Sequence, residues 1–169
     1  ITGLSFTKHA SGSTIDKNAA LNTDTGGQRM KANMIAVFDK EKEKVLVCRR
    51  RKNPYKGLLN FVGGKIEKEE DGLTAAYREL WEETGITDAD IELTHLMDFN
   101  YLVFDNWLEV YFGRLNKDFT VRGEENELLW IDISSDFFDV TQFAGRGNMG
   151  HIMELIKEYE SDLPDEEKY

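Results

Sequence analysis

Three glutamates, Glu79, Glu82 and Glu83, stand at the spacing i, i+3 and i+4. On a helix this spacing makes them neighbours, about 5–6 Å apart at their Cβ atoms, so their charges would repel one another. They would also crowd the C-terminal turns, where the helix dipole disfavours negative charge. A divalent cation offsets both costs, because Mg²⁺ takes a few carboxylates together with water and phosphate oxygens. The pattern therefore indicates a metal site, with a solvated acidic helix face as the alternative.

A glycine pair and a lysine precede the glutamates and favour the metal interpretation. Gly63 and Gly64 follow the apolar pair Phe61-Val62, and Lys65 comes next. A glycine pair lets the backbone turn tightly and approach a ligand closely. Lys65 offers a positive charge to a phosphate. One short stretch thus combines a close-approach backbone, a phosphate-pairing cation and an acidic face.

The segment from Gly64 to Ile86 resembles the Nudix box. That pattern is Gly, five residues, Glu, seven residues, Arg-Glu, an aliphatic residue, any residue, Glu-Glu, any residue, Gly and an aliphatic residue. Each specified position is met over 23 residues, which is far more specific than a lone glycine motif. The flanking strands are similar too, so the resemblance covers roughly residues 30–159. It implies the Nudix fold, an α/β architecture in which a mixed β-sheet is sandwiched between α-helices.

The resemblance implies a role for each residue that matches the box. Arg78 would hold a glutamate through a charge-assisted hydrogen bond, whereas Glu70 would support the loop. Water would attack phosphorus with metal assistance. The ligands implied for Mg²⁺, for which Mn²⁺ can substitute, are the carboxylates of Glu79, Glu82 and Glu83 and the backbone carbonyl of Gly63.

The group that takes the proton from water has several candidates. A glutamate of the metal cluster is one. In family members a loop glutamate often lies a few residues before a strand tryptophan, and Glu124 and Glu125 stand in this position before Trp130. A general base must come within hydrogen-bond reach of the attacking water, and the sequence does not choose between the two. A solvated acidic turn is the alternative interpretation.

Two further groups are candidates for contacts with a substrate. The basic run that begins at Arg49 would clamp the far phosphate through Arg49 or Arg51, since alternate residues share a strand face. An exposed, charge-balancing loop is the alternative. Residues 59–65 are similar to the subgroup that hydrolyses oxidised purine nucleoside triphosphates, in which an Asn at the position of Asn60 contacts the base. A turn-forming role for Asn60 is the alternative. Some members also use acidic residues before the last helix, where residues 143–149 have none, so Phe143 is the candidate for stacking on the base.

The resemblance implies Mg²⁺-dependent hydrolysis of a nucleoside triphosphate to monophosphate and pyrophosphate, with a leaning toward 8-oxo-dGTP. The first alternative is hydrolysis of another nucleoside diphosphate derivative, such as ADP-ribose, a sugar nucleotide or a dinucleoside polyphosphate. The second is a binding module without catalysis. The complete set of box glutamates favours an enzyme, because an idle module could lose any of them.

Several short elements must position these residues. Apolar runs at residues 34–38 and 44–49, separated by a charged turn, predict a β-hairpin. Residues 71–84 predict a helix that Asp71 and Gly85 cap, with a core-facing stripe of Leu73, Ala76, Tyr77 and Leu80. Further strands are predicted at residues 93–104, 107–115 and 128–132, and a closing helix at residues 150–159.

Length and charge limit the classes of protein that remain. The chain has 169 residues and a formal net charge of −11, which disfavours a nucleic-acid polymer or an anionic membrane as partner. We expect a tail, leader or linker at residues 1–29, one domain at residues 30–160 and an acidic tail at residues 161–169. The single cysteine, Cys48, is expected to be buried. A nucleotide substrate and a cytoplasmic location are expected, and because family members are often dimers, a homodimer is a further expectation.

Overall fold

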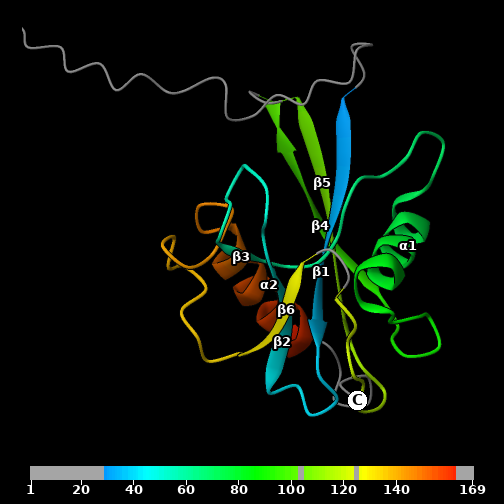
Figure 1. Ribbon diagram of the computed structural model, residues 1–169, viewed down its shortest axis with the longest axis vertical. Coiled ribbons are helices and arrows are strands. Elements are labelled where there is room, and N and C mark those ends of the chain that lie inside the picture. Colours follow the sequence, from blue (N-terminus) through cyan, green and yellow to red (C-terminus); the bar gives the residue numbers. More distant parts are fainter. Residues whose placement is uncertain (1–28, 103–104, 124–125, 163–169) are drawn as a thin grey trace, which may run out of the picture.

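The computed structural model describes residues 29–102, 105–123 and 126–162. Within these residues the elements follow one another as strands and two helices (Figure 1). Their bounds are β1 Met30–Phe38, β2 Lys44–Arg49, β3 Leu59–Asn60, α1 Gly72–Thr84, β4 Thr94–Tyr101, β5 Asn106–Arg114, β6 Glu127–Asp132 and α2 Asn148–Asp162.

The strands form one mixed sheet in the order β3-β2-β1-β5-β4, with β6 added beside β2. The expected hairpin is confirmed, because β1 and β2 pair antiparallel with Val37 opposite Leu46. β1 and β5 are parallel from Met30 opposite Asn106 to Phe38 opposite Arg114. β1 therefore lies in the middle of the sheet.

The two helices cover opposite faces of this sheet, as Figure 1 shows. Successive side chains of a strand point to opposite faces. On β1, Ile35 and Val37 pack in the cluster that includes Ala76 and Leu80 of α1. Met34, Ala36 and Phe38 pack in the cluster that includes Ile152 and Ile156 of α2. The expected sandwich of a mixed sheet between helices is confirmed.

Helix α1 begins and ends where the sequence predicts. The Asp71 side chain accepts a hydrogen bond from the Thr74 amide at 3.0 Å, and Gly85 closes the helix in a left-handed conformation with φ 79°. The predicted core stripe is wrong at Leu73, which is 42% exposed. The buried side chains are instead Ala75, Ala76, Leu80 and Thr84. The packing face therefore keeps Ala76 and Leu80 of the predicted stripe and includes Ala75 and Thr84 in place of Leu73.

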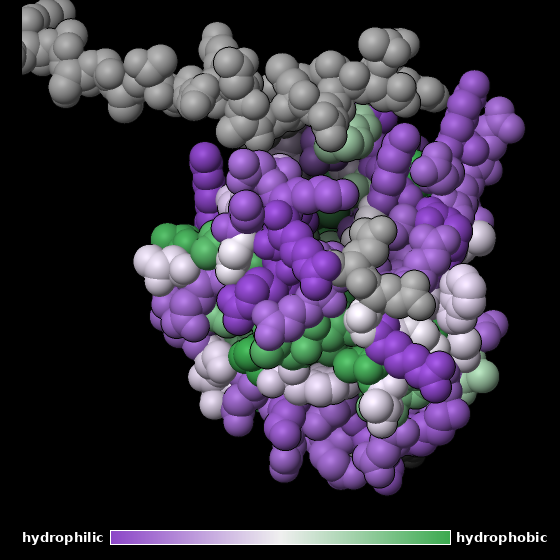
Figure 2. Space-filling view, viewed as in Figure 1, coloured by the Kyte–Doolittle hydropathy of each residue, from purple (hydrophilic) through white to green (hydrophobic). Residues whose placement is uncertain are grey.

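The remaining features agree with an enclosed core under a polar surface. Hydrophilic residues dominate the face shown in Figure 2, apart from a band of apolar side chains. Cys48 is buried as expected, and burial, followed by the nearby charge of Glu83, raises the pKa of its thiol to about 12. Among the described residues, no helix is long and apolar enough to cross a membrane.

Candidate active site

The Gly63–Gly64 turn lies directly against β1. The Asn33 amide donates to the Gly64 carbonyl at 2.8 Å, and the Gly64 amide donates to the Asn33 side-chain Oδ1 at 3.0 Å. Gly63 has φ 135°, and a Cβ atom there would lie 2.6 Å from the Asn33 carbonyl oxygen. Only glycine fits this conformation and this contact. The turn is thus held to the centre of the sheet.

Two of the three predicted metal-binding glutamates meet this turn. The Glu83 carboxylate accepts a hydrogen bond from the Gly63 amide at 3.0 Å. The Glu79 carboxylate covers Gly64, since a Cβ atom there would lie 2.1 Å from its Oε2. The structure therefore brings together Gly63, Glu79 and Glu83, which the sequence places in separate segments.

Arg78 joins the acidic groups around the turn. Its Nε and one terminal nitrogen each donate to Glu70 at 2.9 Å, and that same nitrogen also donates to the Lys65 carbonyl at 2.9 Å. The other terminal nitrogen donates to Glu79 at 2.8 Å and to Glu82 at 3.3 Å. The hydrogen bonds from Arg78 lower the pKa of the Glu70 carboxyl, and the pKa of Arg78 is raised by Glu70 first and Glu79 second. Glu70 and Arg78 therefore both stay charged near neutral pH.

The donor set has the chemistry that a hard divalent cation requires. Carboxylate oxygens of Glu79, Glu82 and Glu83 and the backbone of Gly63 surround one edge of α1, and Mg²⁺ prefers such oxygen ligands. In the arrangement described, Glu79 and Glu82 turn toward Arg78, and Glu83 turns toward the Gly63 amide. Within the described residues, no three His, Cys, Asp or Glu side chains are placed to hold one metal ion together. The residue types fit a cation, and the side chains would have to rotate to share it.

The predicted basic residues have exposed side chains. Lys65 is exposed, and its Nζ lies 4.0 Å from Glu67. Arg49 is exposed and donates to Glu127 at 2.7 Å and to the Gly57 carbonyl at 3.2 Å. Arg51 is exposed as well. Arg49 is therefore paired with Glu127 rather than with a box glutamate.

The two residues predicted to contact a base lie on different faces. Asn60 pairs with Cys48 across β2 and β3, which places it on the α1 side, and its buried Oδ1 has no hydrogen-bond partner among the described residues. Phe143 is 3% exposed, and its ring centroid lies 4.9 Å from that of Phe137. Its ring therefore belongs to the core and presents no face for stacking. Glu124 and Glu125 lie outside the described residues.

Sequence reasoning missed Asn33 and an aromatic cluster at the end of β4. Phe99 stacks on Tyr101 with a centroid distance of 6.0 Å, and the His151 ring lies 6.1 Å from Phe99. The Asn148 side chain donates to the Tyr101 hydroxyl. Burial raises the pKa of Tyr101, and Tyr55 is near enough to add to this shift. The alternating Phe99 and Tyr101 were a signal, but only the fold brings Asn148 beside them.

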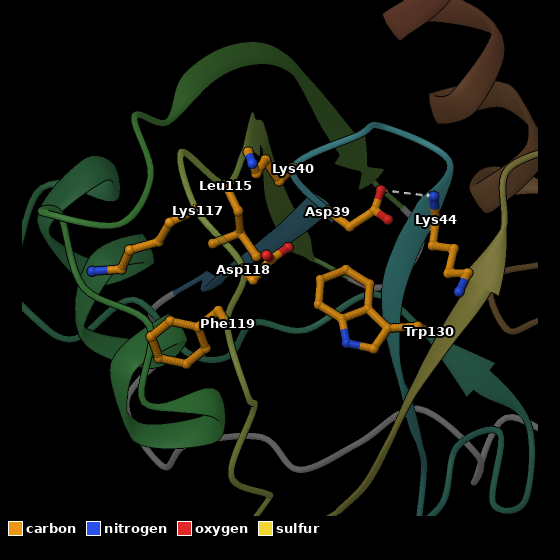
Figure 3. A pocket seen from close by; sticks show the side chains of 8 residues that line it. All are labelled: Asp39, Lys40, Lys44, Leu115, Lys117, Asp118, Phe119 and Trp130. Carbon is orange, nitrogen blue, oxygen red and sulfur yellow. Dashed lines mark hydrogen bonds between the residues drawn. The ribbon is translucent and has the colours of Figure 1, made fainter.

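A separate hollow of about 160 Å³ lies where β1 ends and β2 begins (Figure 3). Trp130 and Phe119 line it together with charged side chains, and Lys117 in its wall pairs with Asp90 at 2.6 Å. None of the predicted site residues lines it. The glycine turn and the acidic edge of α1 therefore remain the candidate site.

A mixed sheet between two helices, with carboxylates and a glycine turn at the edge of one helix, defines an α/β protein with a cluster of oxygen donors beside α1. The sequence matches the NUDIX domain over residues 27–155. The chain belongs to the NUDIX family.

Curated relatives and solved structures agree with this family. An RNA pyrophosphohydrolase of Pelagibacter ubique (strain HTCC1062) is 37% identical over 101 residues, which cover 56% of this chain and 63% of the relative. Human nucleoside diphosphate-linked moiety X motif 6 is 49% identical over 51 residues, which cover 30% of this chain and 16% of the relative. The chain thus spans less than two thirds of the length of either.

A structure of a C. elegans Ap4A hydrolase in a binary complex has a TM-score of 0.63 at 18% identity and covers 78% of this chain and 99% of its own. A MutT structure, from work on Aliivibrio salmonicida and Vibrio cholerae, has a TM-score of 0.59 at 22% identity with the same coverage. Both likenesses show the fold alone.

Proposed function

We propose that this protein hydrolyses a phosphoanhydride bond of a nucleoside diphosphate derivative in a reaction that depends on a divalent cation, Mg²⁺ in the cell. The observation that carries this proposal is the meeting of Glu79 and Glu83 at the Gly63–Gly64 turn. The membership of the chain in the NUDIX family supports it.

The residues of the site have distinct roles in this proposal. Glu79, Glu82, Glu83 and the Gly63 carbonyl hold the cation, which when bound supplies Lewis-acid polarisation of the phosphates. Arg78 orients Glu79 and Glu82 and is itself fixed by Glu70. Lys65, exposed beside the turn, pairs with a phosphate oxygen of the substrate.

The attacking water needs a carboxylate that can take its proton. Glu82 suits this role, because its side chain is 48% exposed and is held to Arg78 only by a long contact of 3.3 Å. Glu83 is engaged by the Gly63 amide, and Glu79 is largely enclosed. Glu124 and Glu125 remain proposals for the same role on sequence grounds.

For the substrate we propose a nucleoside triphosphate, cleaved to monophosphate and pyrophosphate, with 8-oxo-dGTP first among the candidates. The unpaired Oδ1 of Asn60 supports a polar contact with a base edge, because a buried acceptor without a partner is costly. The rings of Phe99 and Tyr101, beside the amide of Asn148, offer a separate stacking surface on the α2 face of the sheet, opposite the face of Asn60. Phe143 has no part in this proposal.

A second candidate substrate is a dinucleoside polyphosphate or an RNA with a 5′-triphosphate. In both, a further nucleotide or an RNA chain is attached to the phosphates that are cleaved. The relative named RNA pyrophosphohydrolase, 37% identical over 101 residues, favours it. The net charge of −11 opposes a long RNA interface, yet a triphosphate at the 5′ end requires contacts with only the first nucleotides. ADP-ribose and sugar nucleotides are tested as well, because they too contain a nucleoside diphosphate.

The test is product release from a substrate panel with Mg²⁺, run beside Glu82→Gln. The panel holds the four dNTPs, 8-oxo-dGTP, ADP-ribose, UDP-glucose, a diadenosine polyphosphate and a short 5′-triphosphorylated RNA. We expect Mg²⁺-dependent release of pyrophosphate and monophosphate from triphosphates, abolished in the variant. Turnover of the RNA or the diadenosine compound alone would select the second candidate. Binding of nucleotides without any turnover would contradict the enzymatic proposal and indicate a binding module.

A further inference from the structure

Asn33 is one of the few polar side chains buried among the described residues. It is 4% exposed and lies near the start of the central strand β1, on the face that packs against α1. Its Cα partner on β5 is Glu109. An apolar residue would suit this place in a buried strand better, so the amide must serve some contact that an apolar side chain cannot make.

That contact is with the glycine turn. Asn33 forms hydrogen bonds with both backbone groups of Gly64. Its backbone amide donates to the Gly64 carbonyl, and its side-chain Oδ1 accepts from the Gly64 amide. It also lies face to face with Gly63, where a Cβ atom would come within 2.8 Å of the same Oδ1. Backbone hydrogen bonds also join Ile35 to Val62 and Ile66 to Lys31, so the Asn33 side chain supplies the one contact of this set that a substitution can remove.

The acceptor role of Oδ1 fixes the orientation of the whole amide. The other end, Nδ2, is then buried, and it has no hydrogen-bond partner among the described residues. A buried donor without a partner costs stability. A side chain retained at this cost in a central strand points to a purpose other than stability.

We propose that Asn33 is a positioning residue for the carboxylate cluster and acts through the Gly63–Gly64 turn. Gly63 fixes Glu83 through its amide, and Gly64 receives the carboxylate of Glu79. Loss of the hydrogen bond from the Gly64 amide to Oδ1 lets the turn move, so the carboxylates of Glu79 and Glu83 are no longer fixed relative to the sheet. The inference rests on the proposed role of these carboxylates in holding a cation.

Two substitutions separate the roles of the amide. Asn33→Leu keeps the approximate volume and removes the acceptor for the Gly64 amide. Asn33→Asp keeps an acceptor oxygen and removes the Nδ2 donor. Asn106→Leu is the matched control, because Asn106 also has a buried amide atom without a partner among the described residues, yet it is the first residue of β5 and pairs with Met30 and Tyr101.

The experiment measures hydrogen exchange of the Gly64 amide and the dissociation constant for Mn²⁺, both well below the melting temperature. We expect N33L to exchange at Gly64 at least about tenfold faster and to bind Mn²⁺ about tenfold more weakly, as for other residues that orient metal ligands. N33D is expected to keep the slow exchange at Gly64, and N106L to keep both properties. A purely structural role would lower the melting temperature of N33L and leave both quantities unchanged, which would overturn the inference.

The two proposals fail in distinguishable ways. Absence of Mn²⁺ binding in the unsubstituted protein would contradict the proposed function. Hydrogen exchange of the Gly64 amide would still show whether Asn33 fixes the turn. Equal Mn²⁺ affinity in N33L and the unsubstituted protein would contradict the inference alone. If N33L does not fold, Asn33→Ser replaces it, because a hydroxyl fits the same space but falls short of the Gly64 amide.

Discussion

At the scale of single residues, the site is built from charges that would destabilise one another without Arg78. Glu79 and Glu82 are both hydrogen-bonded to one terminal nitrogen of its guanidinium, and Glu70 takes the Nε and the other one. A planar guanidinium can serve several carboxylates in fixed directions, which a lysine ammonium cannot. The geometry of Arg78 is therefore as important as its charge.

Arg78→Lys tests this geometry. The variant keeps a positive charge but cannot join Glu70 to the two other carboxylates, so we expect cation affinity and kcat to fall about 10–100-fold. The measurement is Mn²⁺ titration together with steady-state kinetics. Arg114→Lys at the exposed end of β5 is the control, and equal losses in the two variants would show that the geometry of Arg78 is unimportant.

Gly64→Ala tests the close approach of Glu79 to the turn. An added Cβ atom would lie 2.1 Å from Glu79 Oε2, so the carboxylate must move. A displacement of about 1 Å can cost about 100-fold in turnover, and we expect a loss of this order with a folded protein. Gly57→Ala is the control for backbone strain without a clash, since Gly57 has φ 89° and its added Cβ atom would meet nothing within 4 Å. Normal turnover in Gly64→Ala would mean that Glu79 is not needed where the structure places it.

At the scale of elements, local sequence patterns were sufficient to predict some helices and strand pairings and gave no information on others. Helix α1 could be bounded because its cap residues, Asp71 and Gly85, act within one turn of the chain. The β1–β2 hairpin was predictable for the same reason. The parallel pairing of β1 with β5 and the addition of β6 to β2 join distant segments, and no local pattern specifies such contacts.

The residues of the candidate site divide in the same way into those that a local motif predicts and those that only the fold brings together. The Nudix box identified Glu79, Glu82, Glu83 and Arg78 because they lie in one segment of contiguous sequence. Asn33 stands 31 residues before the Gly64 amide that it binds, and in the sequence it is merely a polar residue at the start of an apolar run. The stripe on α1 was misassigned at Leu73 because two faces of the helix carry apolar side chains, and only packing chooses between them.

Gly85→Ala tests the end of α1. Gly85 has φ 79°, and an added Cβ atom would meet nothing within 4 Å, so the cost is backbone strain alone. We expect about 1 kcal/mol of destabilisation, or a melting temperature about 2–4 °C lower. Thermal unfolding followed by circular dichroism measures it. Gly85→Asn should recover part of the loss, because asparagine tolerates this conformation better, and an equal loss in both variants would contradict the explanation by strain.

At the scale of the whole molecule, Asp90 ties the segment after α1 to the segment after β5. Its carboxylate accepts hydrogen bonds from the amide and hydroxyl of Thr87 and pairs with Lys117 at 2.6 Å. Its backbone carbonyl accepts from the amide of Asn116. Contacts between segments so far apart in the chain make this region a test of cooperative stability.

The pH dependence of unfolding follows from this carboxylate. Lys117 first, and then Thr87, lower the pKa of Asp90 to about 2 in the folded protein, against about 3.9 in the unfolded chain. The unfolded state thus binds the proton more readily, so the contribution of Asp90 is fully present above about pH 4 and is lost as the pH falls toward 2. Urea unfolding between pH 7 and pH 2 should show this loss in the unsubstituted protein and a smaller one in Asp90→Asn. Lys117→Met, which removes the largest cause of the shift, should bring the pKa of Asp90 back toward its ordinary value. An identical pH profile in all three proteins would mean that Asp90 does not link these segments.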